Sequence, residues 1–172
     1  MTLLEIKQQA ASLLGISTNF NATTVETVAI DKCAKIIINE VSEQYVDVKH
    51  VEKVFAYGGK IYYKDLSKKV KSIAVVKYND KAVKFNEYAM FFTVEKEGEY
   101  EVKYNYFPIV EEDIELDFPP RFTTNILALG VAGEYCFRKG LIDEAEDFRK
   151  RFFIGLNNVT NTKKSYKIKV VH

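Results

Sequence analysis

The stretch Pro119–Asn158, PPRFTTNILALGVAGEYCFRKGLIDEAEDFRKRFFIGLNN, decides the fold class of this chain. Proline is favoured in the first turn of a helix and glycine just beyond the end of one, so the stretch predicts two helices joined at 138–140. The first helix carries small residues among large apolar ones: Ala128, Gly130, Ala132 and Gly133 among Phe122, Ile126, Leu129 and Cys136. The second has one apolar face opposite a mostly charged one, which is the pattern of an amphipathic helix: Leu141, Ala145, Phe148, Phe152 and Leu156.

Two more helices are predicted near the start of the chain. Each begins with a capping-box pattern, Thr2 with Glu5 and Thr23 with Glu26. Apolar residues follow at helical spacing: Leu3, Ile6, Ala10, Leu13 and Leu14, then Val25, Ala29, Cys33, Ile36, Ile37 and Val41. These helices need a packing partner, and the later helix pair is the only other helical material. The expected arrangement is therefore a four-helix bundle.

Between the two helix pairs the hydrophobic period changes to that of strands. Gly-Gly and Asn-Asp suit two-residue hairpin turns, and a third turn is expected at Glu97-Gly98. The expected hairpins pair Val54–Tyr57 with Lys60–Tyr63, Val70–Tyr78 with Lys81–Phe85, and Phe91–Val94 with Glu99–Phe107. In the last strand, tyrosine and valine alternate with polar residues, which predicts one buried and one wet face. The fold class is α+β, with a small antiparallel sheet or barrel of about six strands inserted into the bundle.

This pattern divides the chain into four segments. Residues 1–48 form the N-terminal helices of the bundle, 49–117 the inserted β domain, 118–159 the C-terminal helical hairpin that completes the bundle, and 160–172 an extended C-terminal arm. In the arm, Tyr166, Ile168 and Val170 alternate with Ser165, Lys167 and Lys169. Such a strand is either an edge strand with a lysine face or a strand lent to the sheet edge of another chain.

Composition narrows the function classes. The net charge of +1 gives no global field that attracts nucleic acid or an anionic membrane. No apolar stretch approaches the roughly 20 residues that span a bilayer, and the first residues lack the basic start and apolar run of a signal peptide. We expect a soluble, intracellular protein. Cys33 and Cys136 each lie on the apolar side of a helical pattern, which predicts buried free thiols rather than a disulfide or a zinc site.

The residues that carry chemistry form no catalytic pattern. His50 and His172 have no cysteine or carboxylate at metal-ligand spacing, so surface positions are expected for both. No nucleophile elbow, phosphate loop or dinucleotide fingerprint occurs. We therefore expect a protein that is not an enzyme and has no metal site or cofactor. The acidic group lacks the glycine and spacing of a calcium loop, which leaves a solvated loop or docking onto a basic partner surface: Glu111, Glu112, Asp113, Glu115 and Asp117.

Several stretches together resemble the head–tail adaptor family of tailed bacteriophages, also called connector or neck ring proteins. They are Gly59–Leu66, Val70–Val76, Gly98–Phe107 and Phe118–Phe153, and the closest matches are Leu129–Cys136 and Leu141–Phe152. The resemblance covers residues 50–156 and implies a helical bundle that carries a β insert. Its motifs are structural and include no catalytic residue.

The resemblance also implies a function and a set of partners. Adaptors are structural virion proteins, made in the host cytoplasm, that form a ring of typically twelve copies at the capsid vertex. The ring joins the portal protein to the next tail or neck protein, contacts no membrane, and leaves a channel through which DNA passes without sequence-specific binding. An arm at the C-terminus grips the portal or a neighbour. Here that interface would comprise Lys163, Lys164, Tyr166, Lys167, Ile168, Lys169 and Val170.

Two patches are needed where identical subunits pack head to tail in a closed ring. The acidic residues Glu111, Glu112 and Asp113 are the candidate complement to the lysine arm. We expect an acidic or neutral channel lining, because a basic lining would retain DNA through its phosphates. One alternative is a tail-completion or tail-terminator ring protein. Another is a small enzyme or ligand-binding domain, which convergent polar groups in a cleft of the β insert would indicate.

Overall fold

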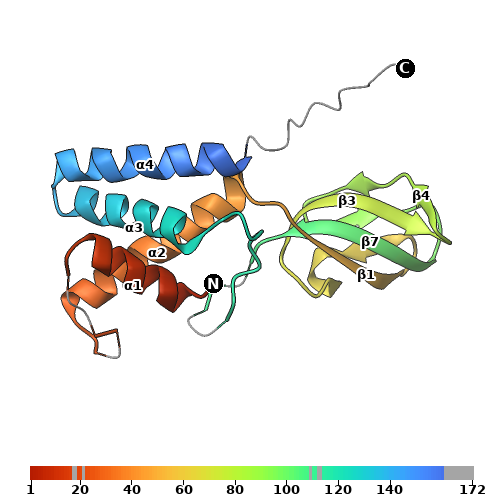
Figure 1. The fold of residues 1–172 in the computed structure, drawn as a ribbon. Helices are drawn as coiled ribbons and strands as arrows, with labels where there is room; N and C mark the ends of the chain where they lie inside the picture. The colour runs from red at the N-terminus through yellow and green to blue at the C-terminus, as the bar shows by residue number, and fades with distance from the viewer. Residues whose placement is uncertain (17–18, 21, 109, 112–113, 161–172) are drawn as a thin grey trace, which may run out of the picture. The chain divides into compact units, whose positions relative to one another are not determined.

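The computed structural model describes residues 1–16, 19–20, 22–108, 110–111 and 114–160, and the chain divides into two compact units. The first unit comprises Met1–Tyr45 and the chain from Ile109 onward, and the second comprises Val46–Pro108. The helices lie in the first unit and the strands in the second (Figure 1). The fold is α+β, and the helical unit is assembled from both ends of the sequence.

The boundaries of the β unit differ from the predicted insert, which spanned 49–117. The segment around Leu116 belongs to the helical unit instead. Its backbone N–H donates to the Met1 carbonyl at 2.9 Å, and Thr2 and Glu115 form an isolated antiparallel bridge. Leu116 is buried. Part of the acidic segment is therefore held against the N-terminus rather than forming a freely solvated loop.

The four helices are α1 (Leu3–Leu13), α2 (Val25–Gln44), α3 (Thr124–Arg138) and α4 (Ile142–Thr160). The predicted capping box of α1 is present, with the Glu5 N–H donating to Thr2 Oγ1 at 3.2 Å and the Thr2 N–H donating to Glu5 Oε2 at 2.8 Å. In α2 the box lies one residue later than predicted. Thr24 pairs reciprocally with Thr27, whose hydroxyl takes the place expected for the Glu26 carboxylate.

Helix α3 contacts each of the other three helices. Its residues from Leu127 to Gly133 are all buried, as expected for a helix surrounded by neighbours. A Cβ atom at Gly130 would lie 2.9 Å from side-chain atoms of both Ile37 in α2 and Phe152 in α4. The small residues of α3 therefore let two neighbouring helices approach it closely.

The turn between α3 and α4 corrects one detail of the predicted apolar face. Gly140 has a φ of 77°, and the Leu141 N–H donates to the Cys136 carbonyl at 2.9 Å, which closes α3 in the manner of a Schellman motif. Leu141 thus caps α3 instead of packing in α4, and its side chain is exposed. The buried residues of α4 are Ala145, Phe152 and Leu156.

The strands of the second unit form two antiparallel sheets (Figure 1). The larger sheet has the order β1 (Val48–Ala56), β7 (Gly98–Tyr106), β3 (Val70–Tyr78), β4 (Lys81–Val83). The smaller has the order β2 (Lys60–Tyr62), β6 (Phe91–Thr93), β5 (Asn86–Glu87), and a short 3₁₀ helix, η1 (Tyr63–Asp65), follows β2. Neither sheet closes on itself within the described residues, so the barrel alternative is not what the chain forms.

Only one of the three predicted hairpins is paired as expected. Strands β3 and β4 join through Asn79 and Asp80, both with positive φ. Gly58 and Gly59 form the predicted turn, and Tyr57 and Lys60 exchange backbone hydrogen bonds across it, so the first hairpin is present over one residue pair. Elsewhere β1 pairs along its whole length with β7, and β2 pairs with β6. The predicted β6–β7 hairpin is wrong, because these strands lie in different sheets. The three nine-residue strands β1, β7 and β3 lie next to one another, which satisfies their backbone groups over most of their length.

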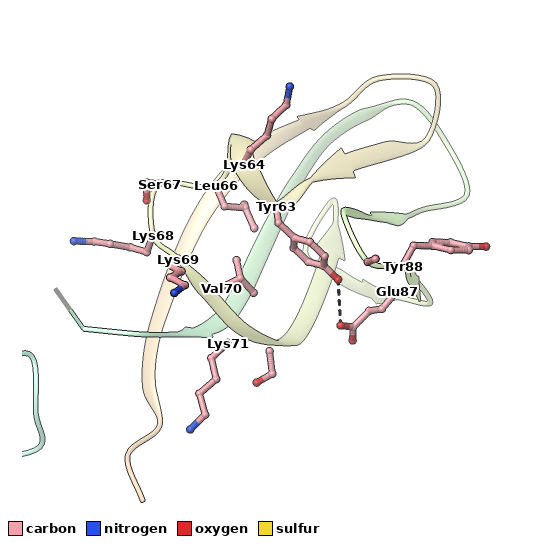
Figure 2. Close-up of a pocket in the computed structure, with 12 residues that line it drawn as sticks. Tyr63, Lys64, Leu66, Ser67, Lys68, Lys69, Val70, Lys71, Glu87 and Tyr88 are labelled. Carbon is pink, nitrogen blue, oxygen red and sulfur yellow. Dashed lines mark hydrogen bonds between the residues drawn. The ribbon is translucent and has the colours of Figure 1, made fainter. Parts of the chain in front are cut away.

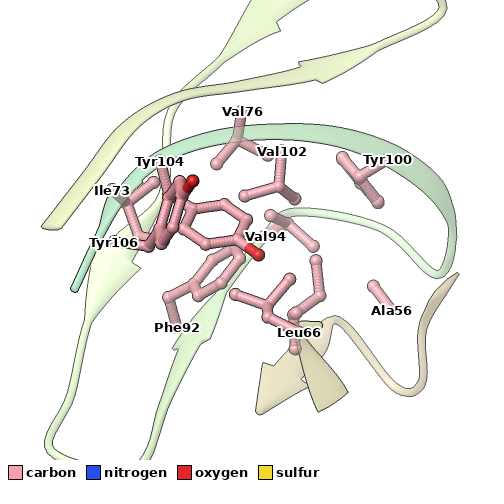
Figure 3. Packing of buried hydrophobic residues seen from close by; sticks show 11 residues of the cluster. Ala56, Leu66, Ile73, Val76, Phe92, Val94, Tyr100, Val102, Tyr104 and Tyr106 are labelled. Carbon is pink, nitrogen blue, oxygen red and sulfur yellow. The ribbon is translucent and has the colours of Figure 1, made fainter. Parts of the chain in front are cut away.

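The buried face of β7 is the one predicted from its alternation: Tyr100, Val102, Tyr104 and Tyr106. These side chains share one core with Ile61 and Phe92 of the smaller sheet. Figure 3 shows Phe92 beside Tyr104 and Tyr106 of β7. The buried hydroxyl of Tyr100 donates to the Lys96 carbonyl at 2.9 Å. The two sheets are therefore held together by a single aromatic-rich core.

No helix in the described part of the chain combines the length and the apolar character needed to cross a membrane.

Cys33 and Cys136 are free and buried, as predicted, and their reactivity gives a first test of the helical core. Burial raises the pKa of the Cys33 thiol to about 11 and also raises the pKa of Cys136. For Cys33 this leaves about 100-fold less thiolate than at the ordinary value of 9.0. We expect Ellman's reagent to label Cys33 at least about 100-fold more slowly in the native protein than in the urea-unfolded protein, and to label Cys136 more slowly as well. Equal rates in the two states would contradict the burial of both thiols.

Candidate functional site

A basic loop connects the two sheets of the β unit. Residues 60–72 hold five lysines and one aspartate, although the whole chain is nearly neutral. Leu66 ends η1, with its N–H donating to the Tyr63 carbonyl, and its side chain is buried in the core. Because this one apolar side chain anchors the loop, the polar residues on either side of it face solvent.

The loop forms one wall of a pocket of about 630 Å³ (Figure 2). We call it the lysine pocket. It is lined by Tyr63, Lys64, Leu66, Ser67, Lys68, Lys69, Val70, Lys71, Ser72, Glu87, Tyr88 and Ala89. A single carboxylate, Glu87, faces four lysines, and it accepts a hydrogen bond from the Tyr63 hydroxyl at 3.3 Å. The pocket therefore has a positive lining with hydroxyl groups interspersed.

The four lysines of the pocket differ in how their charge is compensated. The Lys71 ammonium donates to the Val46 carbonyl at 3.0 Å and pairs with Asp47 at 3.3 Å. Lys64, Lys68 and Lys69 form no ion pair within the part of the chain that the structure describes. Their Nζ atoms lie 5.3–5.6 Å from the centroids of aromatic rings, those of Tyr62, Tyr106 and Phe107 respectively. Three positive charges are thus available to an external anion.

A half-buried carboxylate fixes the shape of the loop. Glu52 Oε1 accepts hydrogen bonds from the Ser67 N–H at 2.9 Å, from the Ser67 hydroxyl at 3.1 Å and from the Tyr104 hydroxyl. The Tyr104 hydroxyl in turn accepts from the Lys68 N–H at 3.2 Å. Burial alone would raise the pKa of Glu52, but the bonds from Tyr104 and Ser67 outweigh it and hold that pKa below its usual value. Burial and the Glu52 carboxylate raise the pKa of Tyr104.

His50 lies beside this cluster, with Nε2 at 3.3 Å from the Ser67 hydroxyl oxygen. It is half-buried and meets Tyr104 and Tyr106 edge to face, so one side of the ring packs against the β unit. In a serine–histidine–acid triad the carboxylate orients the imidazole, which then accepts the serine proton. Here Glu52 takes the serine hydroxyl bond itself. The arrangement positions the loop and does not activate a nucleophile.

Nearly all of the predicted interface residues lie outside those that the structure describes. The arm residues Lys163–Val170, and Glu112 and Asp113 of the acidic segment, lie outside the described residues. Glu111 is described and is exposed. Among the described residues, no group of three or more histidine, cysteine, aspartate or glutamate side chains is placed to hold a metal ion.

The lysine pocket was not among the predicted sites, although a signal for it exists in the sequence. The run KDLSKKVK at 64–71 has four lysines around one buried leucine. The overall charge balance hides this local excess.

A comparison of the sequence with protein-family models finds no match. A comparison with curated proteins also finds no match.

The Glu52 cluster predicts a pH-dependent stability effect. Because the folded-state pKa of Glu52 is depressed, its ionised form stabilises the fold above its unfolded-state pKa, and this contribution is lost as the pH falls through the folded-state pKa. We expect Tyr104→Phe to lower the free energy of unfolding at neutral pH by about 1–2 kcal/mol, since Glu52 and the Lys68 N–H each lose a partner. The difference in free energy of unfolding between Tyr104→Phe and wild type should become smaller in acid. Urea unfolding over a pH series measures both.

The matched control is Tyr100→Phe, because the Tyr100 hydroxyl donates to a backbone carbonyl that does not titrate. Its cost should stay constant with pH. A Tyr104→Phe cost that is equally constant would contradict the role assigned to Glu52.

Proposed function

We propose that this protein is a non-enzymatic structural subunit of a virion connector ring, of the kind that joins portal to tail in tailed bacteriophages. In this proposal the four helices form the adaptor bundle, about twelve copies close the ring, and DNA passes through the channel without sequence-specific binding. The portal and the next tail or neck protein are its partners, and the capsid vertex is its location. The order of parts, two helices, a β unit and two helices, supports the assignment.

The observation that carries the proposal is a pair of separate exposed apolar surfaces on the helical unit. On α2, Val25 and Val28 are 74% and 40% exposed. They border a hollow of about 500 Å³ that Ala29, Lys32 and Arg138 also line. On α4, the exposed apolar residues are Ile142, Phe153 and Ile154. Head-to-tail packing in a closed ring needs two different complementary patches on each copy, and the proposal assigns these two surfaces to that role.

The polarity of such an interface can be tested with single-patch variants. Val28→Glu damages the α2 surface and Phe153→Glu the α4 surface, and burying either carboxylate unpaired would prevent association. In a head-to-tail ring, each variant alone should stay monomeric. An equimolar mixture should form dimers but no rings, because the intact α4 surface of one variant can still meet the intact α2 surface of the other. Sedimentation velocity measures the species.

Matched controls are Gln44→Glu on α2 and Gln8→Glu on α1, both at exposed polar positions away from the two surfaces. These should assemble like wild type when mixed with purified portal and imaged by electron microscopy. Stacked rings on the portal would support the proposal. Rings formed by Val28→Glu or Phe153→Glu would refute this interface, and binding to the tail end in place of the portal would favour the tail-terminator alternative.

A further inference from the structure

The outer face of the smaller sheet carries three neighbouring rings, Tyr62, Tyr88 and Phe91, which we call the aromatic platform. Tyr62 and Phe91 are direct cross-strand partners with ring centroids 5.5 Å apart. Tyr88 stacks on Phe91 at 5.0 Å with an interplanar angle of 25°. Tyr62 is 38% exposed and Tyr88 is 52% exposed. A row of partly exposed rings on a sheet surface offers flat faces on which other rings can stack.

Lysine ammonium groups lie close to two of these rings. The Lys60 ammonium lies 5.3 Å from the centroid of Phe91, and the Lys64 ammonium lies 5.5 Å from that of Tyr62. Lys60, like Lys64, Lys68 and Lys69, has no ion-pair partner among the described residues. Tyr88 and Lys64 belong to both the platform region and the lysine pocket. Figure 2 shows Lys68 and Lys69 on one side of the pocket and Tyr88 on the other.

The ligand that fits this combination is an anion with exposed flat rings. Uncompensated lysines beside a pocket attract phosphate groups, and exposed aromatic side chains stack on nucleic-acid bases that are not already paired. A duplex keeps its bases stacked within the helix, so it would engage the lysines and leave the platform unused. An acidic peptide would likewise use only the charge. The β unit contains no arginine, which is the residue that most often makes specific contacts to base edges.

We propose that the lysine pocket and the aromatic platform together bind single-stranded nucleic acid without strong sequence preference. Lys64, Lys68 and Lys69 contact the phosphates, and Tyr62 and Tyr88 stack on bases. The proposal goes beyond the connector ring and does not depend on it, since every residue involved belongs to the β unit of one copy.

Binding is tested with the full chain and fluorescein-labelled oligothymidylate and oligouridylate of about 15 nucleotides, measured by fluorescence anisotropy. Contact of three lysines with a single strand predicts a salt slope of about −2, so affinity should fall about 20-fold between about 50 and 200 mM salt. The two oligonucleotides separate a preference for DNA from one for RNA. A duplex of equal length should bind more weakly than either single strand.

Two variants test the two halves of the site. A triple variant with glutamine in place of Lys64, Lys68 and Lys69 should show almost no dependence of affinity on salt concentration. The control changes three exposed lysines elsewhere in the same unit to glutamine, namely Lys49, Lys81 and Lys96. It should keep the wild-type salt slope. Tyr88→Ala should weaken binding about tenfold. Tyr57→Ala removes a ring that is 73% exposed but lies outside the platform, and should leave affinity unchanged.

The proposal is overturned if the wild-type chain binds neither oligonucleotide at low salt, or if the control lysine variant loses as much affinity as the pocket variant. It is also overturned if duplex binds as tightly as single strands, or if polyglutamate of equal charge competes equally well, since the site would then recognise charge alone. Ring assembly, measured separately by sedimentation, should be unaffected by Tyr88→Ala, so failure of one proposal is distinguishable from failure of the other.

Discussion

A Gly130→Val variant is expected to lose about 3 kcal/mol of its free energy of unfolding. Even the first added carbon would lie 2.9 Å from Ile37 Cγ2 and 2.9 Å from Phe152 Cε2, on two different helices. A shift of the added side chain away from one of these residues pushes it closer to the other. The three helices must therefore move apart. The higher helix propensity of valine returns only about 0.5 kcal/mol. Urea unfolding followed by far-ultraviolet circular dichroism measures the loss.

The control for this prediction is Asn157→Val, which places the same β-branched residue at an exposed position of α4. Its effect should stay within about 0.5 kcal/mol of wild type. Gly130→Ala should fall between the two, because it adds a single carbon to the same contact. A Gly130→Val variant as stable as Asn157→Val would show that α3 is not tightly enclosed at this point.

Phe92→Ala is the second substitution with a large expected effect, a loss of about 3–4 kcal/mol. Phe92 is fully buried at the centre of β6, with its ring 5.8 Å from that of Phe85 and 6.0 Å from that of Tyr63. Removing the ring leaves a cavity where the two sheets share their core, and the short strands around it have few other contacts to retain them. Unfolding monitored by tyrosine fluorescence reports on this unit.

Phe55→Ala is the matched control, because Phe55 lies in the same unit but is 41% exposed. It should cost less than about 1 kcal/mol. Phe92→Leu, which retains part of the buried volume, should give an intermediate loss. If Phe92→Ala and Phe55→Ala were equally mild, the packing of the smaller sheet against the larger would contribute little to stability.

The helices were predictable because their signals are local. The capping box at Thr2 and Glu5, the helical spacing of apolar residues and the glycine at 140 each act within one or two turns of chain. The errors were equally local. The start of α2 moved by one residue, since the Thr27 hydroxyl accepts a bond from the Thr24 N–H and completes a capping box there, in place of the predicted Thr23 and Glu26.

The strand partners were less predictable. Two-residue turns at Gly58-Gly59 and Asn79-Asp80 were correctly placed, but a turn fixes only the residues beside it. Which long strand lies next to β7 depends on pairings such as Val48 with Tyr106, which are far apart in sequence. Alternation shows which face of a strand is buried, and carries no information about its neighbour.

The predicted and observed candidate sites differ for a related reason. The predicted interface was placed on residues 163–170 and 111–113, and it remains a prediction, since of these the structure describes only Glu111. The lysine pocket combines the loop at 64–71 with residues 87–89, at the end of β5 and just after it. Its basic half was visible as a run of lysines. The aromatic platform beside it appeared only once Tyr62 and Phe91 were known to be partners.

The pairing of Val48 with Tyr106 has a consequence for how the molecule assembles. These residues are the first and the last of the long β ladder, so a folded β unit joins the two points where the polypeptide enters and leaves it. Only the residues outside the β unit then count as flexible connection between α2 and α3, which is roughly a quarter of the full connection. The shorter connection lowers the entropy cost of bringing α2 and α3 together by about 1 kcal/mol. On the ribosome the β unit is complete before α3 emerges. It can therefore form first and hold the early helices within reach of the late ones.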